Sequence, residues 1–184
     1  MKNPTLGFTL IELLVTIVVA GILMAIAVPA FNNFVMNDRD ATQVNSLVES
    51  LNYARSMALK LNSQFGVQVC PSSDGQTCNA PAAGWAAGWV VLDMSVPATP
   101  VPLQAIPGLG AVNVLSATGA GANSITFRSN GSVSNAGVPT PAQIKICDPR
   151  GGAFARDVEV SPVGTITSTQ TPGQSATGAA LACP

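Results

Sequence analysis

An apolar segment extends from residue 8 to residue 37 and limits how this chain can fold. Its single ionisable residue is Glu12, and no further charge follows until Asp38. About 20 apolar residues in a helix cross the hydrocarbon core of a bilayer. In lipid a helix satisfies its own backbone hydrogen bonds, even when it is rich in Val and Ile. The segment therefore predicts a helix that spans a membrane.

Glu12 distinguishes this segment from a plain membrane anchor. An unpaired carboxylate costs at least about 2 to 3 kcal/mol near the bilayer centre, and less near its surface. The segment itself holds no basic residue, since Lys2 is the only one before Arg39. A cut just before Phe8 would create a new α-amino group. We expect Glu12 to pair with such an amine on a neighbouring molecule, which would make the helix an assembly device.

The helical pattern continues beyond the span. Pro29 removes one backbone hydrogen bond, so we expect a kink where the helix leaves the membrane. Downstream, apolar residues recur every three or four positions in one stripe: Val44, Leu47, Val48, Leu51, Ala54, Ala58 and Leu61. This stripe predicts an amphipathic half of the helix that packs on a globular domain.

Extended segments replace the helical periodicity from Phe65 onward. The candidate strands are short runs rich in β-formers and bounded by Gly and Pro, at 65–70, 88–93, 124–128, 143–147, 157–161 and 163–167. Asn130 and Gly131 predict a hairpin turn. A helix followed by strands is typical of an α+β fold. We expect one long amino-terminal helix, transmembrane and then amphipathic, packed on an antiparallel β-sheet domain.

Two stretches are predicted to be loops. Residues 95–107 contain four prolines, too many for a central strand, although 101–106 could form an edge strand. Residues 169–180 are rich in Thr, Gly, Ser and Ala, and we expect a flexible tail that Cys183 holds in place. With a leader at 1–7 and the span at 8–36, residues 37–184 are expected to form one globular domain.

The four cysteines, Cys70, Cys78, Cys147 and Cys183, all follow the membrane segment and predict disulfides in an oxidising compartment. Cys70 and Cys78 enclose a short turn-rich loop and could pair locally, which would leave Cys147 to pair with Cys183. Three pairings are possible in principle, and the sequence excludes none of them. The spacing fits a four-cysteine zinc site poorly.

Composition limits the chemistry. Charged residues make up 9% of the 184 residues, the net charge is −1 and His is absent. This disfavours a strong basic surface for nucleic acid and removes every His-based catalytic or metal site. The acids are scattered and no base stands at motif spacing from a serine, so we expect no catalytic residue, metal or cofactor. Trp85 and Trp89 are expected to fill the core.

The hexapeptide at 7–12, Gly-Phe-Thr-Leu-Ile-Glu, followed by an apolar helix, resembles the class III signal of type IV pilins and type II secretion pseudopilins. The resemblance implies that a prepilin peptidase cuts between Gly7 and Phe8 and methylates the new amino-terminal Phe8. A secretory signal peptide fits less well, because its apolar region is shorter and lacks an internal acid such as Glu12.

Further motifs narrow the resemblance to the GspH/FimT group of minor pilins and pseudopilins, in particular its FimU and FimT branches. These motifs are Asn-Tyr-Ala-Arg-Ser-Met-Ala at 52–58, Val-Cys-Pro-Ser at 69–72, Gly-Trp-Val-Val at 88–91 and Ile-Cys-Asp-Pro-Arg-Gly at 146–151. The resemblance implies the pilin fold and a place near the tip of a filament, where such proteins prime assembly or link tip proteins to the major pilin.

One branch of this group binds DNA through a Gly-Arg-x-Arg element after the last strands. The corresponding residues here, 164–167, are Gly-Thr-Ile-Thr and lack both arginines. The remaining cations of the region are Lys145, Arg150 and Arg156. We expect exposed ion pairs of Arg150 with Asp148 and of Arg156 with Asp157. These three cations are therefore weak candidates for contacts with DNA phosphates.

The resemblance thus implies a structural minor pilin that is not an enzyme. Its expected partners are other minor pilins, the major pilin and the prepilin peptidase. We expect a single span in the bacterial inner membrane with a periplasmic domain, and later a place in a type IV pilus on the cell surface. The alternatives are a minor pseudopilin of a type II secretion system and a DNA-binding pilin of natural transformation.

Overall fold

The computed structural model describes residues 9–79, 84–108, 113–119, 123–135, 138–139, 141–169 and 171–183. Its internal contacts divide the chain into two compact units, Met1–Arg39 and Asp40–Pro184, each of which is described by itself. The expected leader at 1–7, with Gly7, and the expected first mature residue, Phe8, lie outside the described residues.

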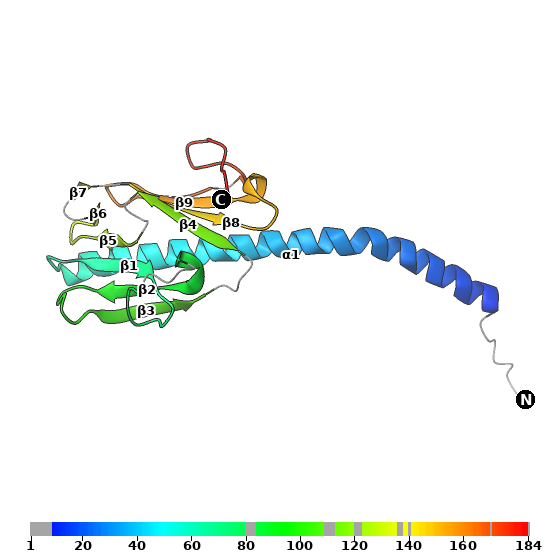
Figure 1. The fold of residues 1–184 in the computed structure, drawn as a ribbon, viewed down its shortest axis with the longest axis horizontal. Helices are drawn as coiled ribbons and strands as arrows, with labels where there is room; N and C mark the ends of the chain where they lie inside the picture. Colours follow the sequence, from blue (N-terminus) through cyan, green and yellow to red (C-terminus); the bar gives the residue numbers. More distant parts are fainter. Residues whose placement is uncertain are drawn as a thin grey trace, which may run out of the picture. The chain divides into compact units, whose positions relative to one another are not determined.

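The helix α1 extends from Leu10 to Leu61 and contributes to both units (Figure 1). Within the described residues it is the helix whose length and composition would allow it to cross a membrane. It continues through Pro29 without interruption, so the kink stays a prediction. Asn62 follows with a left-handed backbone (φ 48°) and ends the helix, a common way for helices to terminate.

In the second unit α1 buries one face. Five apolar residues of the expected stripe are buried there, namely Val44, Leu47, Leu51, Ala54 and Ala58, and Val48 packs beside them. The predicted amphipathic half is therefore confirmed. Leu61 is the exception, since it is 38% exposed at the end of the helix.

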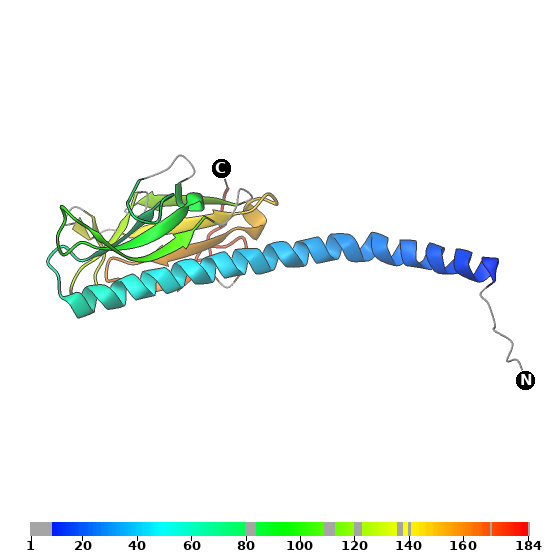
Figure 2. The ribbon, with the colours of Figure 1, turned by 90° about the horizontal axis from the view of Figure 1, so that it is seen from below.

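The described strands form two four-stranded antiparallel sheets and a two-stranded one (Figures 1 and 2). The first sheet has the order β3-β2-β1-β5, with β1 Val67–Pro71, β2 Gly88–Asp93, β3 Val101–Pro107 and β5 Ile125–Phe127. The second has the order β10-β9-β8-β4, with β4 Val114–Gly119, β8 Ala142–Cys147, β9 Arg156–Val160 and β10 Ile166–Ser168. Strands β6 (Ser134–Asn135) and β7 (Val138–Pro139) form the small sheet, and short 3-10 helices lie at Gly84–Ala87 and Gly152–Phe154. The α+β class is confirmed.

One core joins α1 to both sheets. Alternate residues of the strands face the helix, so that Trp89 of the first sheet and Ile144 of the second belong to the same buried cluster as Leu47. The indole N–H of Trp89 donates to the hydroxyl oxygen of Ser50 on α1 at 3.0 Å, which satisfies the polar atom of a fully buried ring. Trp85 is buried as well, so the expectation that both tryptophans fill the core is confirmed.

Two parts of the predicted loops are structured. Residues 101–107 form β3 at the edge of the first sheet, where Pro102 and Pro107 need not donate a ladder hydrogen bond. Residues 171–183 fold back over the second sheet: the Gly173 N–H donates to the carbonyl of Ala155 at 2.7 Å, and the Leu181 N–H donates to the carbonyl of Gly173 at 2.9 Å. Backbone hydrogen bonds and the Cys147–Cys183 bond therefore hold this segment against the second sheet. The expected attachment through Cys183 is confirmed, and the expected flexibility stays a prediction.

The cysteines form the disulfides Cys70–Cys78 and Cys147–Cys183, the two pairs that local pairing favoured. Each one stands on the side of a sheet that faces away from α1. Cys70 packs there with Val90 and Leu92 of the first sheet. Cys147 and Cys183 pack against Ala155 and Leu181 on the second sheet. The two disulfides therefore hold irregular segments over the outer faces of the two sheets.

We expect the Cys147–Cys183 bond to stabilise the fold more than the Cys70–Cys78 bond. Their sequence separations are 36 and 8, for which loop-closure entropy gives about 4 and about 2.5 kcal/mol. Replacing both cysteines of either pair by alanine and measuring the urea midpoint of the full chain in detergent tests this order. A larger loss for the Cys70/Cys78 variant would contradict it.

Candidate functional site

The first turn of α1 presents Glu12 on its surface. Thr9 caps the helix: its hydroxyl oxygen accepts a hydrogen bond from the backbone N–H of Glu12 at 3.3 Å. Thr-x-x-Glu is the sequence pattern of a capping box, in which the acid also stands close to the positive end of the helix dipole. This pattern could have identified Thr9 from the sequence. Glu12 is exposed and forms no ion pair within the described part of the chain.

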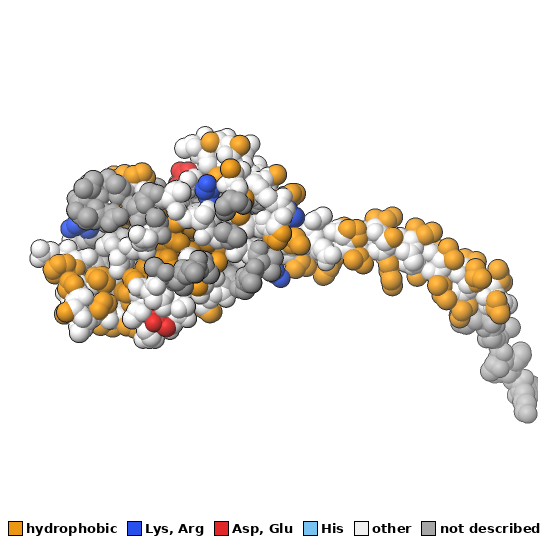
Figure 3. All heavy atoms as spheres, viewed as in Figure 1, with side chains coloured by type: hydrophobic (Ala, Val, Ile, Leu, Met, Phe, Trp, Pro, Cys, Tyr) orange, Lys and Arg blue, Asp and Glu red, His pale blue; other side chains and the backbone are white. Residues whose placement is uncertain are grey.

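The surface around this turn is apolar on every side. All large hydrophobic side chains from Leu10 to Phe34 are at least 49% exposed, and Figure 3 shows hydrophobic atoms along this whole part of the helix. A helix that is apolar all round is stable in lipid or among other helices, but not in water. The first unit therefore needs surroundings that the chain itself does not supply.

A buried polar cluster holds the start of the second unit's helical segment. Asn113, just before β4, donates to the carboxylate oxygen of Asp40 and to the amide oxygen of Gln43, both at 2.7 Å. Arg150, in the turn after β8, lies with Nη2 3.2 Å from Oδ2 of Asp40 and also pairs with Asp148. Asp40, Gln43, Asn113 and Asp148 are all at least 93% buried. The cluster thus connects α1 to two strands of the second sheet.

Two carboxylates share one guanidinium in this cluster. Burial raises the pKa of Asp40 above its ordinary value; the hydrogen bond from Asn113 and the charge of Arg150 oppose this rise, and Asp148 adds to it. Arg150 is also held over the ring of Phe154, at 4.2 Å from the centroid. The expected exposed ion pair of Arg150 with Asp148 is therefore buried, because Asp40, distant in sequence, covers it.

The three weak candidates for DNA contacts do not come together. Arg150 is engaged in the buried cluster. Lys145 faces away from the core and donates to the carbonyl of Ala182 at 3.4 Å. Arg156 pairs in register with buried Ile146 and lies on the opposite face of the sheet from Lys145. The expected pair of Arg156 with Asp157 is not among the ion pairs of the described residues.

Residues 164–167 lie beside an acid. Thr165 and Thr167 line a groove of about 440 Å³ together with Gln143 and Glu159. Thr118, Gln143, Glu159 and Thr167 stand directly opposite one another across the four strands of the second sheet. Burial, and next the nearby Asp157, raise the pKa of Glu159. The carboxylate of Glu159 gives this groove a negative charge, which would repel the phosphate backbone of a nucleic acid.

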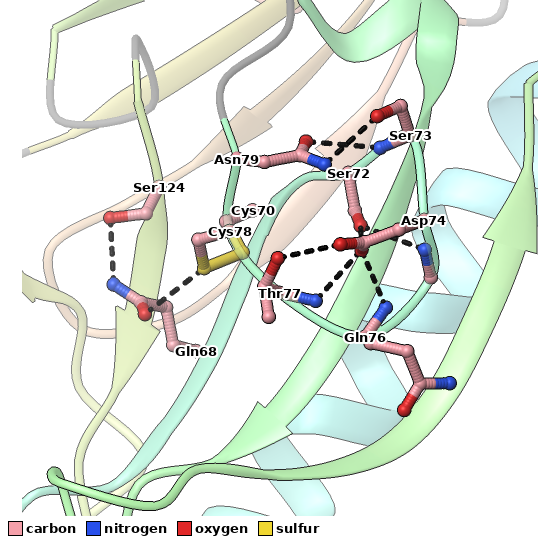
Figure 4. Close-up of a disulfide and its surroundings, with 11 residues drawn as sticks. Gln68, Cys70, Ser72, Ser73, Asp74, Gln76, Thr77, Cys78, Asn79 and Ser124 are labelled. Carbon is pink, nitrogen blue, oxygen red and sulfur yellow. Dashed lines mark hydrogen bonds between the residues drawn. A yellow bond between two sulfur atoms is a disulfide. The ribbon is translucent and has the colours of Figure 1, made fainter.

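The loop closed by Cys70–Cys78 has its own hydrogen-bond centre (Figure 4). The carboxylate of Asp74 accepts hydrogen bonds from the backbone N–H groups of Gln76 and Thr77 and from the hydroxyls of Thr77 and Ser72, at 2.8 to 2.9 Å. These donors, the Gln76 N–H first, hold the pKa of Asp74 well below its usual range. The arrangement fixes the loop. No group of three His, Cys, Asp or Glu that could bind a metal was found in the described ranges.

Known structures show the same fold. The chain is similar to the type IV minor pilin FimU of Pseudomonas aeruginosa strain PAO1 in two crystal forms. The TM-scores are 0.55 and 0.52, the identities 20% and 22%, and the matches cover 75% and 70% of this chain and 98% and 91% of FimU. A long amino-terminal helix packed on antiparallel sheets is thus the pilin fold.

Sequence comparisons agree. Residues 3–28 match the prokaryotic N-terminal methylation motif, and residues 43–164 match the type II transport protein GspH family. The chain belongs to this GspH family. It is also 36% identical over 77 residues to a type IV major fimbrial protein FimA of Dichelobacter nodosus, and 36% identical over 84 residues to a fimbrial protein of the same organism. These matches cover 42% and 46% of the chain and less than half of each relative, 45% and 46% of its length.

The raised pKa of Asp40 predicts how stability depends on pH. The folded state holds this proton more tightly than the unfolded chain does, so the contribution of Asp40 is fully present below its unfolded pKa of about 3.9 and is lost as the pH rises through the folded pKa. Asp40→Asn should remove this loss. Its melting temperature relative to the unmodified chain should therefore rise between about pH 4 and pH 7.

Asp148→Asn is the matched control for Asp40→Asn. It removes the other carboxylate partner of Arg150 in a buried pair and should cost about 3 kcal/mol. Thermal unfolding of the full chain in detergent, followed by circular dichroism, measures both variants. Equal effects of the two substitutions, or a difference for Asp40→Asn that does not change with pH, would contradict this account.

Proposed function

We propose that the chain is a structural minor pilin that assembles into a type IV pilus, where it primes assembly or links tip proteins to the major pilin. The observation that carries this proposal is the first unit of α1, which is apolar on all sides and carries Glu12 at its first turn. The methylation-motif match over residues 3–28 and the pilin fold support it.

The proposed mechanism depends on two environments for the same helix. Before assembly the helix is stored in the bacterial inner membrane. The second unit, Asp40–Pro184, then lies in the periplasm and corresponds to the globular domain that was expected at 37–184. The prepilin peptidase cuts between Gly7 and Phe8 and methylates Phe8. In the filament the helices of neighbouring subunits replace lipid around the apolar surface. Glu12 then meets the terminal amine of a neighbour, which removes the cost of an unpaired carboxylate in apolar surroundings.

In this proposal the second unit is a structural domain that the helix carries into the filament, and it is not an enzyme. The features described in this unit are structural: two disulfides, a buried polar cluster around Arg150 and one core shared by helix and sheets. Its partners in this proposal are other minor pilins and the major pilin. Contact with DNA is not favoured, because Glu159 lies in the groove beside residues 164–167.

A second candidate is a minor pseudopilin of a type II secretion system. The match of residues 43–164 to the type II transport protein family favours it. The same helix, cleavage and charge pairing would then serve protein export. The genes beside this one discriminate the two candidates, because pilus and secretion machines use different motor and outer-membrane components.

Substitutions at Glu12 separate charge pairing from helix capping. Glu12→Gln retains a side chain that suits a capping box but has no charge, whereas Glu12→Ala loses both. We expect both variants to insert into the membrane normally and to enter filaments at least about tenfold less, since an ion pair of even about 1.4 kcal/mol accounts for that factor. Immunoblots of sheared filaments and membranes measure this. Normal incorporation of Glu12→Gln would contradict charge pairing.

Substitution at Gly7 tests processing. Gly7→Leu should leave an uncleaved precursor, because a bulky residue stands next to the bond that the peptidase cuts. Intact-mass spectrometry should show a methylated chain that starts at Phe8 for the unmodified protein and an unprocessed chain for the variant. A mature mass in the variant would contradict the cleavage assignment.

A further inference from the structure

Arg55 of α1 forms no ion pair with the residues that the structure describes. Its side chain is half-buried, and its Nε atom is buried with no hydrogen-bond partner. All nine acidic residues lie in the described ranges, and the ion pairs among them involve Arg150. No carboxylate side chain of the protein therefore neutralises Arg55.

Two tight turns approach the Arg55 side chain. In the first, the Gly131 N–H donates to the carbonyl of Arg128, and in the second, the Gly164 N–H donates to the carbonyl of Ser161, both at 2.8 Å. Both glycines have left-handed backbones, with φ of 77° and 83°. A Cβ at either glycine would lie 3.2 Å from Nε of Arg55. The turns thus form a close cradle for the guanidinium, which only glycine backbone permits.

Two exposed apolar residues flank this cradle in the same segments. Leu59 stands one helical turn after Arg55, is 50% exposed and has a methyl carbon 3.4 Å from the Cβ position of Gly131. Val163, next to Gly164, is 68% exposed. We call these residues, Arg55, Leu59, Gly131, Val163 and Gly164, the Arg55 surface. An arginine packed against backbone turns, with exposed apolar residues in the same segments, is typical of the residues that dominate protein interfaces.

The buried Nε of Arg55 is out of reach of another molecule, but the two terminal Nη atoms are not among the buried unpartnered atoms. They form no side-chain hydrogen bond or ion pair with the described residues, so an acceptor from outside the fold can reach them. The planar guanidinium, with its fork of N–H donors, matches a carboxylate. The apolar rim fits a protein surface better than a phosphate backbone, whose binding requires several cations. We propose that the Arg55 surface is a docking site for an aspartate or glutamate side chain of a partner protein. The identity of this partner rests on the proposed function: in a pilus it would be a neighbouring pilin subunit.

The binding test uses the full chain, labelled with ¹⁵N, in dodecyl maltoside micelles. The probes are N-acetyl-glutamate amide, its neutral analogue N-acetyl-glutamine amide, and inorganic phosphate. The acidic probe should shift the Arg55 Nε–H resonance and the amides of Gly131 and Gly164 in a saturable way. Arg55→Met should weaken this binding at least tenfold, whereas Lys60→Met, an exposed cation on the same helix, should leave it unchanged.

Three outcomes of the titration would overturn the proposal. They are equal shifts with the neutral analogue, no saturable shift with the acidic probe, and tighter binding of phosphate than of the acidic probe. The last result would assign the surface to phosphate groups. The titration does not depend on filament assembly, so its failure leaves the proposed function untouched, and a failure of Glu12 variants to affect assembly leaves this site untouched.

Stability separates docking from a structural role. Arg55→Met keeps the apolar stem and removes the unpartnered donors, so the melting temperature should stay the same or rise. If Arg55→Met instead lowers the melting temperature by more than about 5 °C and Arg55→Lys does not, the charge serves the fold. That result would overturn the proposal.

Discussion

The second unit depends on one buried face of one helix. Leu47, Leu51, Ala54 and Ala58 are fully buried there, and residues of both four-stranded sheets pack on them in a single cluster. Neither sheet has another core of comparable size, since the remaining described clusters hold three buried residues each. Loss of this face would therefore separate the sheets from the helix and from each other. Small side chains such as Ala54 and Ala58 let the strands approach the helix closely.

Charge is scarce in this protein, so each buried or apolar-facing charge has a definite consequence. Asp40 and Asp148 share Arg150 and fix the point where α1 joins the second unit. Glu12 and Arg55 differ from this group, because neither has a partner of opposite charge in the described chain. Glu12 is an acid in the first unit, and Arg55 is a base in the second unit. Both charges fit a protein in which neighbouring molecules supply the missing counter-charges.

Local patterns in the sequence predicted much of the fold, but they did not predict contacts between residues that are distant in sequence. The stripe from Val44 to Ala58, the alternating strands and the pairing of Cys70 with Cys78 depend on nearby residues, and the structure contains all three. β4 was missed because Val114–Gly119 has small and polar residues and no strong alternation. The contact of Arg150 with Asp40 joins residues 110 positions apart, and no local pattern indicates it. The Thr9 cap, by contrast, is encoded in the local pattern Thr-x-x-Glu.

The order of the cysteines has a consequence for biogenesis. In a chain that leaves the membrane from its amino-terminal side, Cys70 and Cys78 emerge first, and Cys147 emerges before Cys183. The native bonds join the first cysteine to the second and the third to the fourth. Oxidation that keeps pace with translocation therefore produces the native connectivity directly, without reshuffling by a disulfide isomerase. The outer face of the first sheet is closed before the second sheet has been completed.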